Sequence, residues 1–329
     1  MMKVGFGGFA LGCAAALLAG CAGLQPPVGT PGATPQTSEI TQHALSGKSW
    51  MLPEAKGEDL LYVSDGKERV VVFSYPGDKL VGTLAISEAK GLCADSEGDV
   101  FITIAQGEGG LYEYAHGGTQ PIETLIDDGD GLPYGCSVDP VTGNLAVANH
   151  SFDDGNVAIF TGAKGQPTFY SGSGFNKYFY CGYDDAGNLF VDGETYTTED
   201  FVFGEIPKGG SDIMPLTVDM GLASPGAVQW DGKHMTIADP GQGELFRIRV
   251  SGSEANVVGT TALDGYGTPG AQSWIQGNRL MVQDGEYGGR LGFWRYPKGV
   301  FPQKVLRRGL NPRVGILPGV TVSVPPSSR

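Results

Sequence analysis

The sequence predicts an all-β protein, a six-bladed β-propeller with four antiparallel strands in each blade. Three observations lead to this prediction. The 329 residues include 54 glycines and 21 prolines, a composition typical of many short strands joined by tight turns. A glycine-led pattern recurs along the chain, and each repeat holds four short apolar segments. Repeats of about 40 to 45 residues with four strands each are typical of propeller blades.

The repeat is clearest where a turn leads into an apolar segment, as in Gly187-Asn-Leu-Phe-Val. Glycines begin this pattern at five positions spaced 45, 44, 45 and 45 residues apart: Gly98, Gly143, Gly187, Gly232 and Gly277. A looser copy begins at Gly57, 41 residues before Gly98. One apolar segment precedes five of these turns, and three apolar segments follow each turn. We name the four expected strands of a unit A, B, C and D in chain order. The glycine pattern starts strand B.

The two ends of the repeat region predict how the ring closes. Pro318-Gly319-Val-Thr-Val-Ser matches strand A of other units, but no strand B follows it. The copy at Gly57 has strands B, C and D but a poor strand A, with Pro53 in its middle. We therefore expect Val320–Val324 to supply strand A of the first blade, which leaves no open edge between blades. Alternatively, Trp50–Leu52 fills that place and the tail packs outside.

The N-terminus predicts export and a lipid anchor. Lys3 precedes an apolar run from Val4 to Ala19, which is typical of a secretion signal. Leu18-Ala-Gly-Cys21 resembles the lipobox of bacterial lipoproteins. This resemblance implies cleavage before Cys21 and acylation of that residue, palmitate included, and two or more acyl chains anchor a protein stably. An ordinary signal peptide or an uncleaved N-terminal helix is the alternative.

The domain plan follows from these segments. We expect a signal peptide at 1–20, a flexible tether at 21–48, the propeller at 49–324 and a short tail at 325–329. The tether is rich in Pro, Thr, Gly and Ala and cannot bury enough apolar surface to fold. The expected location is the cell envelope. Ala22, rather than Asp, follows the lipid site, and by resemblance to Gram-negative lipoproteins this favours the outer membrane if the host is Gram-negative.

Charge and cysteine content limit the partners. The formal net charge of −14 argues against nucleic acid and anionic headgroups and favours cations or a basic partner. Outside the signal and the lipid site, the cysteines are Cys93, Cys136 and Cys181. We expect all three to be free and buried, with a Cys136–Cys181 disulfide as the alternative. No C-x-x-C spacing occurs, which argues against zinc. We expect a monomer.

One segment carries a family resemblance: Leu60-Leu-Tyr-Val-Ser-Asp65, followed by an Arg and the run Val70-Val-Val-Phe-Ser-Tyr-Pro-Gly77. It resembles six-bladed NHL-repeat and gluconolactonase-like propellers, and the resemblance covers about residues 49 to 324. That fold hosts both enzymes and binding proteins, so it predicts architecture rather than activity. In such enzymes carboxylates and an Asn hold a divalent ion in the central channel. By blade position the resemblance implies Asn149 and Asp192 as metal ligands, with Ca²⁺ or another divalent cation.

The B–C and D–A loops of a propeller share one face, which we call the upper face. Polar side chains lie at or just past the expected ends of the B strands: Asp65, Gln106, Asn149, His150, Asp192, Asp239 and Asp284. Among the histidines, only His150 is expected on this face. The D–A loop around Asp127, Asp128 and Asp130 adds carboxylates. Two or three of these oxygens could bind a cation or another ligand. Alternatively, each Asp side chain shapes its own turn by accepting backbone hydrogen bonds.

The predicted function is binding. The sequence contains no G-x-S-x-G, H-E-x-x-H or P-loop motif, and His150 has no second histidine in expected reach. Aromatic residues near the upper face, among them Tyr134, Phe152, Phe179 and Tyr196, would suit a sugar or a peptide. We therefore expect a non-catalytic scaffold that presents this face to an envelope protein, a glycan or a cation. The alternative is a metal-dependent lactonase of the gluconolactonase-like type.

Overall fold

The computed structural model describes residues 47–65, 67–105, 109–152, 154–265, 269–285, 289–311 and 318–326. They belong to one compact unit, Ser46–Arg329. The expected signal peptide, Cys21 and the tether up to residue 46 lie outside the described residues, so their predictions are not addressed by the fold. Within the described ranges the only helices are two 3-10 turns, η1 (Pro53–Gly57) and η2 (Thr161–Ala163), and none is long and apolar enough to cross a membrane.

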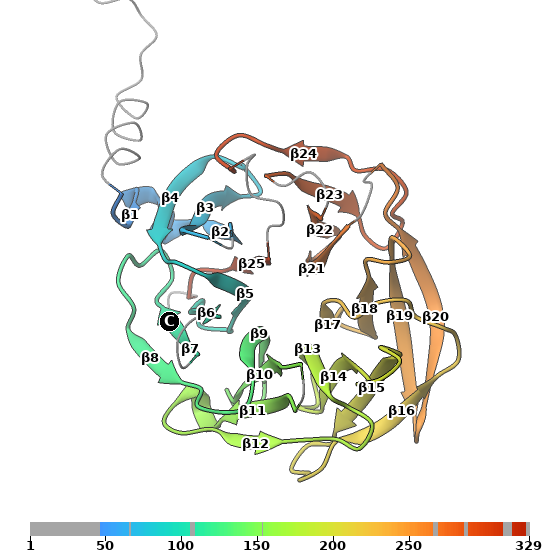
Figure 1. Cartoon of the computed structure of the whole chain (residues 1–329). Helices are drawn as coiled ribbons and strands as arrows, with labels where there is room; N and C mark the ends of the chain where they lie inside the picture. The colour runs from blue at the N-terminus through green and yellow to red at the C-terminus, as the bar shows by residue number, and fades with distance from the viewer. Residues whose placement is uncertain are drawn as a thin grey trace, which may run out of the picture. The chain divides into compact units, whose positions relative to one another are not determined.

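The rest of the described chain forms antiparallel sheets arranged around a common centre (Figure 1). The first sheet has the order β1 (Trp50–Met51), β4 (Leu80–Ala85), β3 (Arg69–Tyr75), β2 (Asp59–Ser64) and β25 (Gly319–Ser323). The second contains β5 (Ala89–Ala94), β6 (Val100–Ile104), β7 (Gly110–Tyr114) and β8 (Glu123–Ile126). The third contains β9 (Leu132–Val138), β10 (Leu145–His150), β11 (Asn156–Phe160) and β12 (Thr168–Tyr170).

An eight-stranded sheet follows, and it consists of two four-stranded meanders. The first meander contains β13 (Lys177–Tyr183), β14 (Leu189–Glu194), β15 (Phe201–Ile206) and β16 (Met214–Val218). The second contains β17 (Val228–Trp230), β18 (Met235–Asp239), β19 (Glu244–Ser251) and β20 (Glu254–Ala262). A short parallel pairing of β16 with β20 joins them. The last sheet contains β21 (Pro269–Gln276), β22 (Arg279–Asp284), β23 (Leu291–Arg295) and β24 (Lys304–Leu306).

The first strand of each meander faces the centre and the last lies at the periphery, as the ring of labels β5, β9, β13, β17 and β21 shows in Figure 1. The arrangement is that of a propeller, with the apolar cores packed between neighbouring sheets. One such core includes Val147 of β10 and Phe101 of β6, and the next includes Val191 of β14 and Val157 of β11. Each sheet therefore buries both faces only because it has a neighbour on each side.

The C-terminal strand completes the first sheet. β25 pairs antiparallel with β2, from Leu60 opposite Ser323 to Ser64 opposite Gly319. β1 pairs instead with β4, at the outer edge of the same sheet. The prediction that the C-terminal strand supplies strand A of the first unit is confirmed, and the alternative that Trp50–Leu52 fills this place is wrong. Strand pairing stops at Ser323, one residue before the expected end.

The A–B turns explain the sequence repeat. In the turn that starts after β13, Asp184 Oδ1 accepts hydrogen bonds from the backbone N–H groups of Ala186 (2.9 Å) and Asn188 (2.8 Å). Gly187, between these donors, has φ +89°, a conformation that L-residues with a side chain rarely adopt. Asp95 accepts equivalent bonds from the Glu97 and Asp99 N–H groups, and Gly98 has the place of Gly187. Asp231 forms a shorter turn, in which it accepts from Lys233 and His234 and is followed directly by Gly232. An Asp that accepts backbone hydrogen bonds and a glycine with positive φ therefore recur in these A–B turns, with a spacing that varies.

The prediction that all three cysteines are buried is confirmed, but the prediction that all three are free is wrong. Cys93 forms a disulfide with Cys136, and Cys181 is free and buried. The cores explain both outcomes, because Cys93 and Cys136 belong to the core between the β5–β8 and β9–β12 sheets, whereas Cys181 belongs to the next core. Cys136 and Cys181 occupy equivalent positions of successive A strands, opposite Val147 and Val191, so their side chains enter different cores. Burial raises the pKa of the Cys181 thiol.

Candidate functional site

The structure places the predicted site residues at the upper ends of separate meanders. Asp65 follows β2, and the others lie near or at the ends of β10, β14, β18 and β22. Five of these side chains are at most 2% exposed: Asp65, Asn149, Asp192, Asp239 and Asp284. Gln106 lies outside the described residues. Within the part of the chain that the structure describes, no three His, Cys, Asp or Glu side chains are grouped so that they could hold a metal ion.

Asp65 shapes its own loop, and Asp239 binds both its own loop and the loop before β17. Asp65 Oδ1 accepts hydrogen bonds from the backbone N–H groups of Lys67, Glu68 and Arg69, at 3.1, 2.9 and 3.0 Å. Asp239 Oδ2 accepts from the Ala223 N–H at 2.6 Å, and Oδ1 accepts from the Gln242 N–H at 3.0 Å. These contacts are those of the structural alternative stated above, in which the carboxylate organises the turn.

Asp192 joins two neighbouring meanders. Its Oδ1 accepts a hydrogen bond from the Tyr180 N–H on β13, and its Oδ2 accepts one from the Gly226 N–H just before β17, both at 2.8 Å. Burial raises the pKa of this carboxyl well above its usual range, against the two hydrogen bonds that lower it. Asp284 forms an ion pair with Arg290. Both carboxyls therefore have internal partners at the positions predicted for ligand binding.

Asn149 has different surroundings. Its Nδ2 donates to Asp127 Oδ1 at 3.1 Å and to Asn156 Oδ1 at 2.8 Å. Asn149 Oδ1 and Asp127 Oδ2 are buried and have no hydrogen-bond partner among the described residues. Burial also raises the pKa of Asp127. A buried oxygen without a donor is costly, and a proton, a water molecule or a cation would satisfy it. The role of Asp127 was missed because only the fold brings it beside Asn149.

His150 lies in a cluster of aromatic rings on the upper face. Its ring centroid is 4.7 Å from that of Phe179, 5.4 Å from Phe152 and 5.9 Å from Tyr134. Phe152 is 75% exposed, which makes it the most exposed large apolar side chain of the described residues. Burial, and then the positive charge of Lys177, lower the pKa of His150, so its ring is neutral near pH 7. The ring therefore acts as part of an apolar surface.

Lys177 is held beside this cluster by two carboxylates. Its Nζ lies 3.2 Å from Glu194 Oε2 and 2.6 Å from Glu199 Oε1. The hydrogen bond to Glu199 is the main cause of a raised pKa for Lys177. The pairing with Glu194 follows from strand register, since the two residues lie opposite each other on β13 and β14. Lys177 is thus already neutralised by its neighbours.

We define the acidic-aromatic patch by an apolar group and the exposed carboxylates around it: Leu132, His150, Phe152 and Phe179, with Asp128, Asp130 and Asp154. Leu132 is opposite His150 in the pairing of β9 with β10, so the apolar members are contiguous. Sequence analysis had indicated each residue type on this face. It had not indicated that His150 would be the centre of the aromatic group, because that depends on the packing of β13 against β9 and β10.

Comparison with known proteins shows the fold. No protein-family model matches the chain, and no curated protein matches it. Among solved structures, a chain of the crystal structure of a nidogen/laminin complex has 15% identity and a TM-score of 0.66, over 82% of this chain and 99% of that chain. A protein of unknown function from Bacteroides caccae has 13% identity and a TM-score of 0.60, over 81% of this chain and 99% of that chain.

The chain is a β-propeller. At such low identity, similarity of structure shows this architecture and no ligand or activity. The resemblance to NHL-repeat and gluconolactonase-like propellers therefore stays a prediction, as do the lipid site at Cys21 and the ligand-binding roles of the upper-face residues.

Proposed function

We propose that this protein is a lipid-anchored, extracytoplasmic binding propeller of the NHL-repeat type, with six blades, that holds a basic protein partner on the acidic-aromatic patch and has no catalytic role. The observation that carries the proposal is the group of contiguous apolar side chains around His150, with Phe152 75% exposed. An exposed apolar group bordered by charged residues is typical of protein–protein interaction sites.

Counting meanders rather than sheets supports the proposal of six blades. The eight-stranded sheet contains two antiparallel meanders joined by two residue pairs, and four other sheets contain one meander each. The first of these draws its inner strand from the C-terminus. Closure by the terminal strand joins the two ends of the propeller by backbone hydrogen bonds.

Two features support export to the cell envelope. The N-terminal run and the lipobox-like segment ending at Cys21 are typical of bacterial lipoproteins. The Cys93–Cys136 disulfide also suits an oxidising compartment, because disulfides are rare in the cytosol. The expected site is the outer membrane if the host is Gram-negative. A Cys21→Ser variant is expected to move from the membrane fraction to the soluble fraction, and a variant that stays membrane-bound would contradict the anchor.

The composition of the patch favours a basic protein partner. Aromatic side chains are enriched at the centres of protein interfaces, and exposed carboxylates attract Lys and Arg from a distance. Asp128 and Asp130 closely precede Leu132 in the chain, Asp154 closely follows Phe152, and all three are exposed. The nearby Lys177 is paired with Glu194 and Glu199. A partner segment with an apolar anchor flanked by Lys or Arg would match both features.

The test compares two exposed phenylalanines from different sheets. Phe152 belongs to the patch, whereas Phe301, 66% exposed, lies in the C–D turn of the last sheet and is not a member of the patch. Affinity capture from envelope extracts is carried out with wild type, Phe152→Ala and Phe301→Ala, and binding of the purified partner to each protein is then measured. We expect a partner that binds wild type and Phe301→Ala but not Phe152→Ala. A partner retained by Phe152→Ala and by Asp154→Asn would contradict the proposal.

The lactonase alternative rests on Asn149 and Asp127, whose buried free oxygens could help to hold a divalent cation. Its test is the melting temperature with and without millimolar Ca²⁺, in wild type and Asp127→Asn, together with turnover of a panel of lactones. A rise in the melting temperature that Asp127→Asn abolishes would support the cation site. Turnover that depends on the same cation would be needed to support the enzyme.

A further inference from the structure

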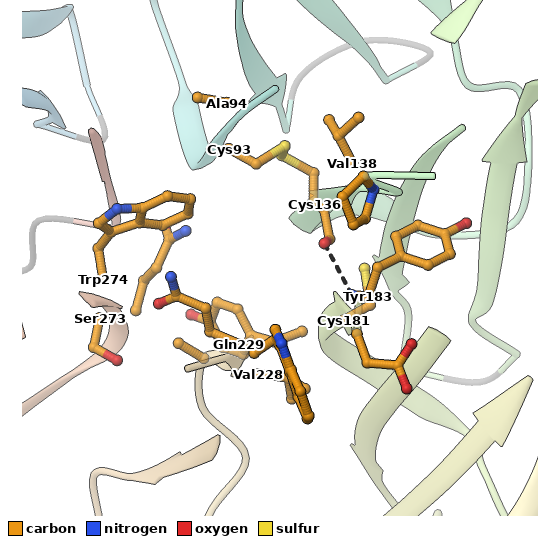
Figure 2. Close-up of a pocket in the computed structure, with 17 residues that line it drawn as sticks. Cys93, Ala94, Cys136, Val138, Cys181, Tyr183, Val228, Gln229, Ser273 and Trp274 are labelled. Atoms are coloured by element: carbon orange, nitrogen blue, oxygen red, sulfur yellow. Dashed lines mark hydrogen bonds between the residues drawn. A yellow bond between two sulfur atoms is a disulfide. The ribbon is translucent and has the colours of Figure 1, made fainter. Parts of the chain in front are cut away.

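We propose that the inner ends of the A strands form a second, independent binding site, which accepts a single neutral sugar ring at the lower mouth of the propeller. A cavity of about 170 Å³ lies there, lined by residues of β5, β9, β13, β17 and β21 and by the turns that follow these strands. The cavity lies at the C-terminal ends of the A strands, whereas the acidic-aromatic patch lies near the other ends of these strands. Figure 2 shows the labelled lining residues arranged around this space.

The size of the cavity limits the ligand to one ring. A cavity of about 150 Å³ holds a benzene molecule, and drug-sized ligands need about 300 Å³ or more. A volume of about 170 Å³ thus fits a single six-membered ring with its substituents. Trp230 and Trp274 line the cavity and are partly exposed, so solvent reaches this part of its wall.

The walls combine flat aromatic surfaces with hydrogen-bonding groups. Trp274 lies on one side of the space, and Tyr183 lies across from it in Figure 2. An indole face packs well against the C–H face of a pyranose ring. Gln229 and Ser273 add an amide and a hydroxyl group to the lining. Beyond its two bonds to Ile275, the Gln229 amide keeps one N–H and one lone pair for the sugar's hydroxyls.

The charge of the lining argues for a neutral ligand. Asp184 is the only charged side chain among the described lining residues. Its carboxylate already accepts hydrogen bonds from Ala186, from the Asn188 N–H and from Asn188 Nδ2. A carboxylate has about four acceptor sites, so one remains for a sugar hydroxyl. An anionic ligand would find no cation here, and a purely apolar ligand would leave the polar groups without partners.

The cavity is also rigid. The Cys93–Cys136 disulfide forms part of its wall and ties β5 to β9. Gln229 is fixed in place because its Nε2 donates to Ile275 O at 3.0 Å and its Oε1 accepts from the Ile275 N–H at 2.8 Å. A site whose groups are held before binding loses less entropy when the ligand enters.

The test uses the tryptophans of the protein as reporters. Of the four tryptophans, Trp230 and Trp274 line the cavity, whereas Trp50 lies on β1 at the outer edge of the first sheet. Fluorescence of the full mature chain is titrated with glucose, galactose, mannose and N-acetylglucosamine, with phenol as an apolar ring of similar size. We expect a saturable change with at least one sugar, an affinity about tenfold lower in Trp230→Leu, and no change in affinity in Trp50→Phe.

A second measurement uses the wild-type protein, so its result does not depend on whether a variant folds. Oxidation by N-bromosuccinimide, mapped by mass spectrometry, should be slower at Trp230 and Trp274 when the bound sugar is present. Phe152→Ala, on the upper face, should bind the sugar as wild type does, which separates this site from the acidic-aromatic patch. The proposal is overturned if none of the four sugars gives a saturable change, if phenol binds more tightly than all of them, or if no sugar protects the two tryptophans.

Discussion

His116 Nδ1 lies 2.6 Å from Ser323 Oγ, so a turn of the second sheet holds the C-terminal strand of the first. Ser323 Oγ also bonds to Gly98 O, and His116 Nε2 lies 3.0 Å from Glu58 O. This network connects the last strand of the chain with the start of β2 and with the A–B turn of the second sheet. It stabilises the contact between the two ends of the propeller.

Removal of the Ser323 hydroxyl should weaken this contact. Ser323→Ala deletes two hydrogen bonds at a fully buried position, and we expect the free energy of unfolding to fall by about 1 to 3 kcal/mol. Urea unfolding followed by far-UV circular dichroism measures the change. The matched control is Ser211→Ala, since Ser211 is exposed and bonds only to Asp212, and its effect should stay within about 0.5 kcal/mol. Equal effects of the two variants would contradict a role for the network.

Glu113 should make stability depend on pH. Burial, and then the charges of Asp99 and Asp95, raise the pKa of Glu113 to about 7 in the folded state, whereas its ordinary value is 4.5. The folded state therefore binds the proton more tightly than the unfolded state does. The stability that this contributes is complete below about pH 4.5 and is lost as the pH rises through about 7.

Glu113→Gln removes this titration and keeps the shape of the side chain. Its melting temperature should equal that of wild type near pH 4.5 and exceed it above pH 7, with the difference growing between these values. Differential scanning calorimetry across that range measures it. Glu68→Gln, an exposed residue of the β2–β3 loop, is the control and should show a constant difference. A difference in melting temperature between Glu113→Gln and wild type that does not change with pH would contradict this prediction.

Ser137→Cys should create a second disulfide. Ser137 lies opposite Ala146 and Cys93 opposite Phe101, which are equivalent places on successive A strands. Cys181 is likewise equivalent to Cys136, so the new cysteine should face Cys181 as Cys93 faces Cys136. Contact between the strands is close, because Tyr183 N donates to Ser137 Oγ at 3.1 Å.

The measurement is the number of free thiols in guanidinium without reductant. Relative to wild type, Ser137→Cys should lose one thiol rather than gain one, and a loop of this length predicts a stabilisation of about 4 kcal/mol. A gain of one thiol would show that the equivalence between the strands does not extend to their side-chain directions.

Asp192 tests whether an upper-face carboxylate is structural. Asp192→Ala leaves the Tyr180 and Gly226 N–H groups without their acceptor, and we expect a loss of about 2 to 5 kcal/mol in unfolding free energy. Chemical denaturation of wild type and variant measures it. A variant as stable as wild type that fails to bind a divalent cation would instead support the ligand role implied by the family resemblance.

The sequence predicted the architecture well because the signals are local and repeated. Asp184, Gly187 and the apolar residues after them form one turn and one strand, and the same pattern recurs at a fixed spacing. The closing strand was predictable because the first unit lacked a strand that the last segment supplied. The disulfide was not predictable, because Cys93 and Cys136 meet only through the direction in which each side chain leaves its strand.

The site was less predictable for a related reason. Asp65, Asp192 and Asp239 were placed correctly at strand ends. The bonds of Asp65 stay within its own turn, but Asp192 and Asp239 also accept from N–H groups of the loop before β17, a contact that the sequence did not predict. The lower cavity could not be anticipated either, since Trp230 and Trp274 belong to different units and come together only around the centre of the ring.

The central claim is that the acidic-aromatic patch binds a basic protein. The most direct measurement is the dissociation constant of the purified partner for wild type, Phe152→Ala and Phe301→Ala at low and high salt. The account predicts an affinity at least about tenfold weaker for Phe152→Ala, unchanged for Phe301→Ala, and weaker at high salt for wild type. Equal dissociation constants for the three proteins, or binding that is insensitive to salt, would contradict it.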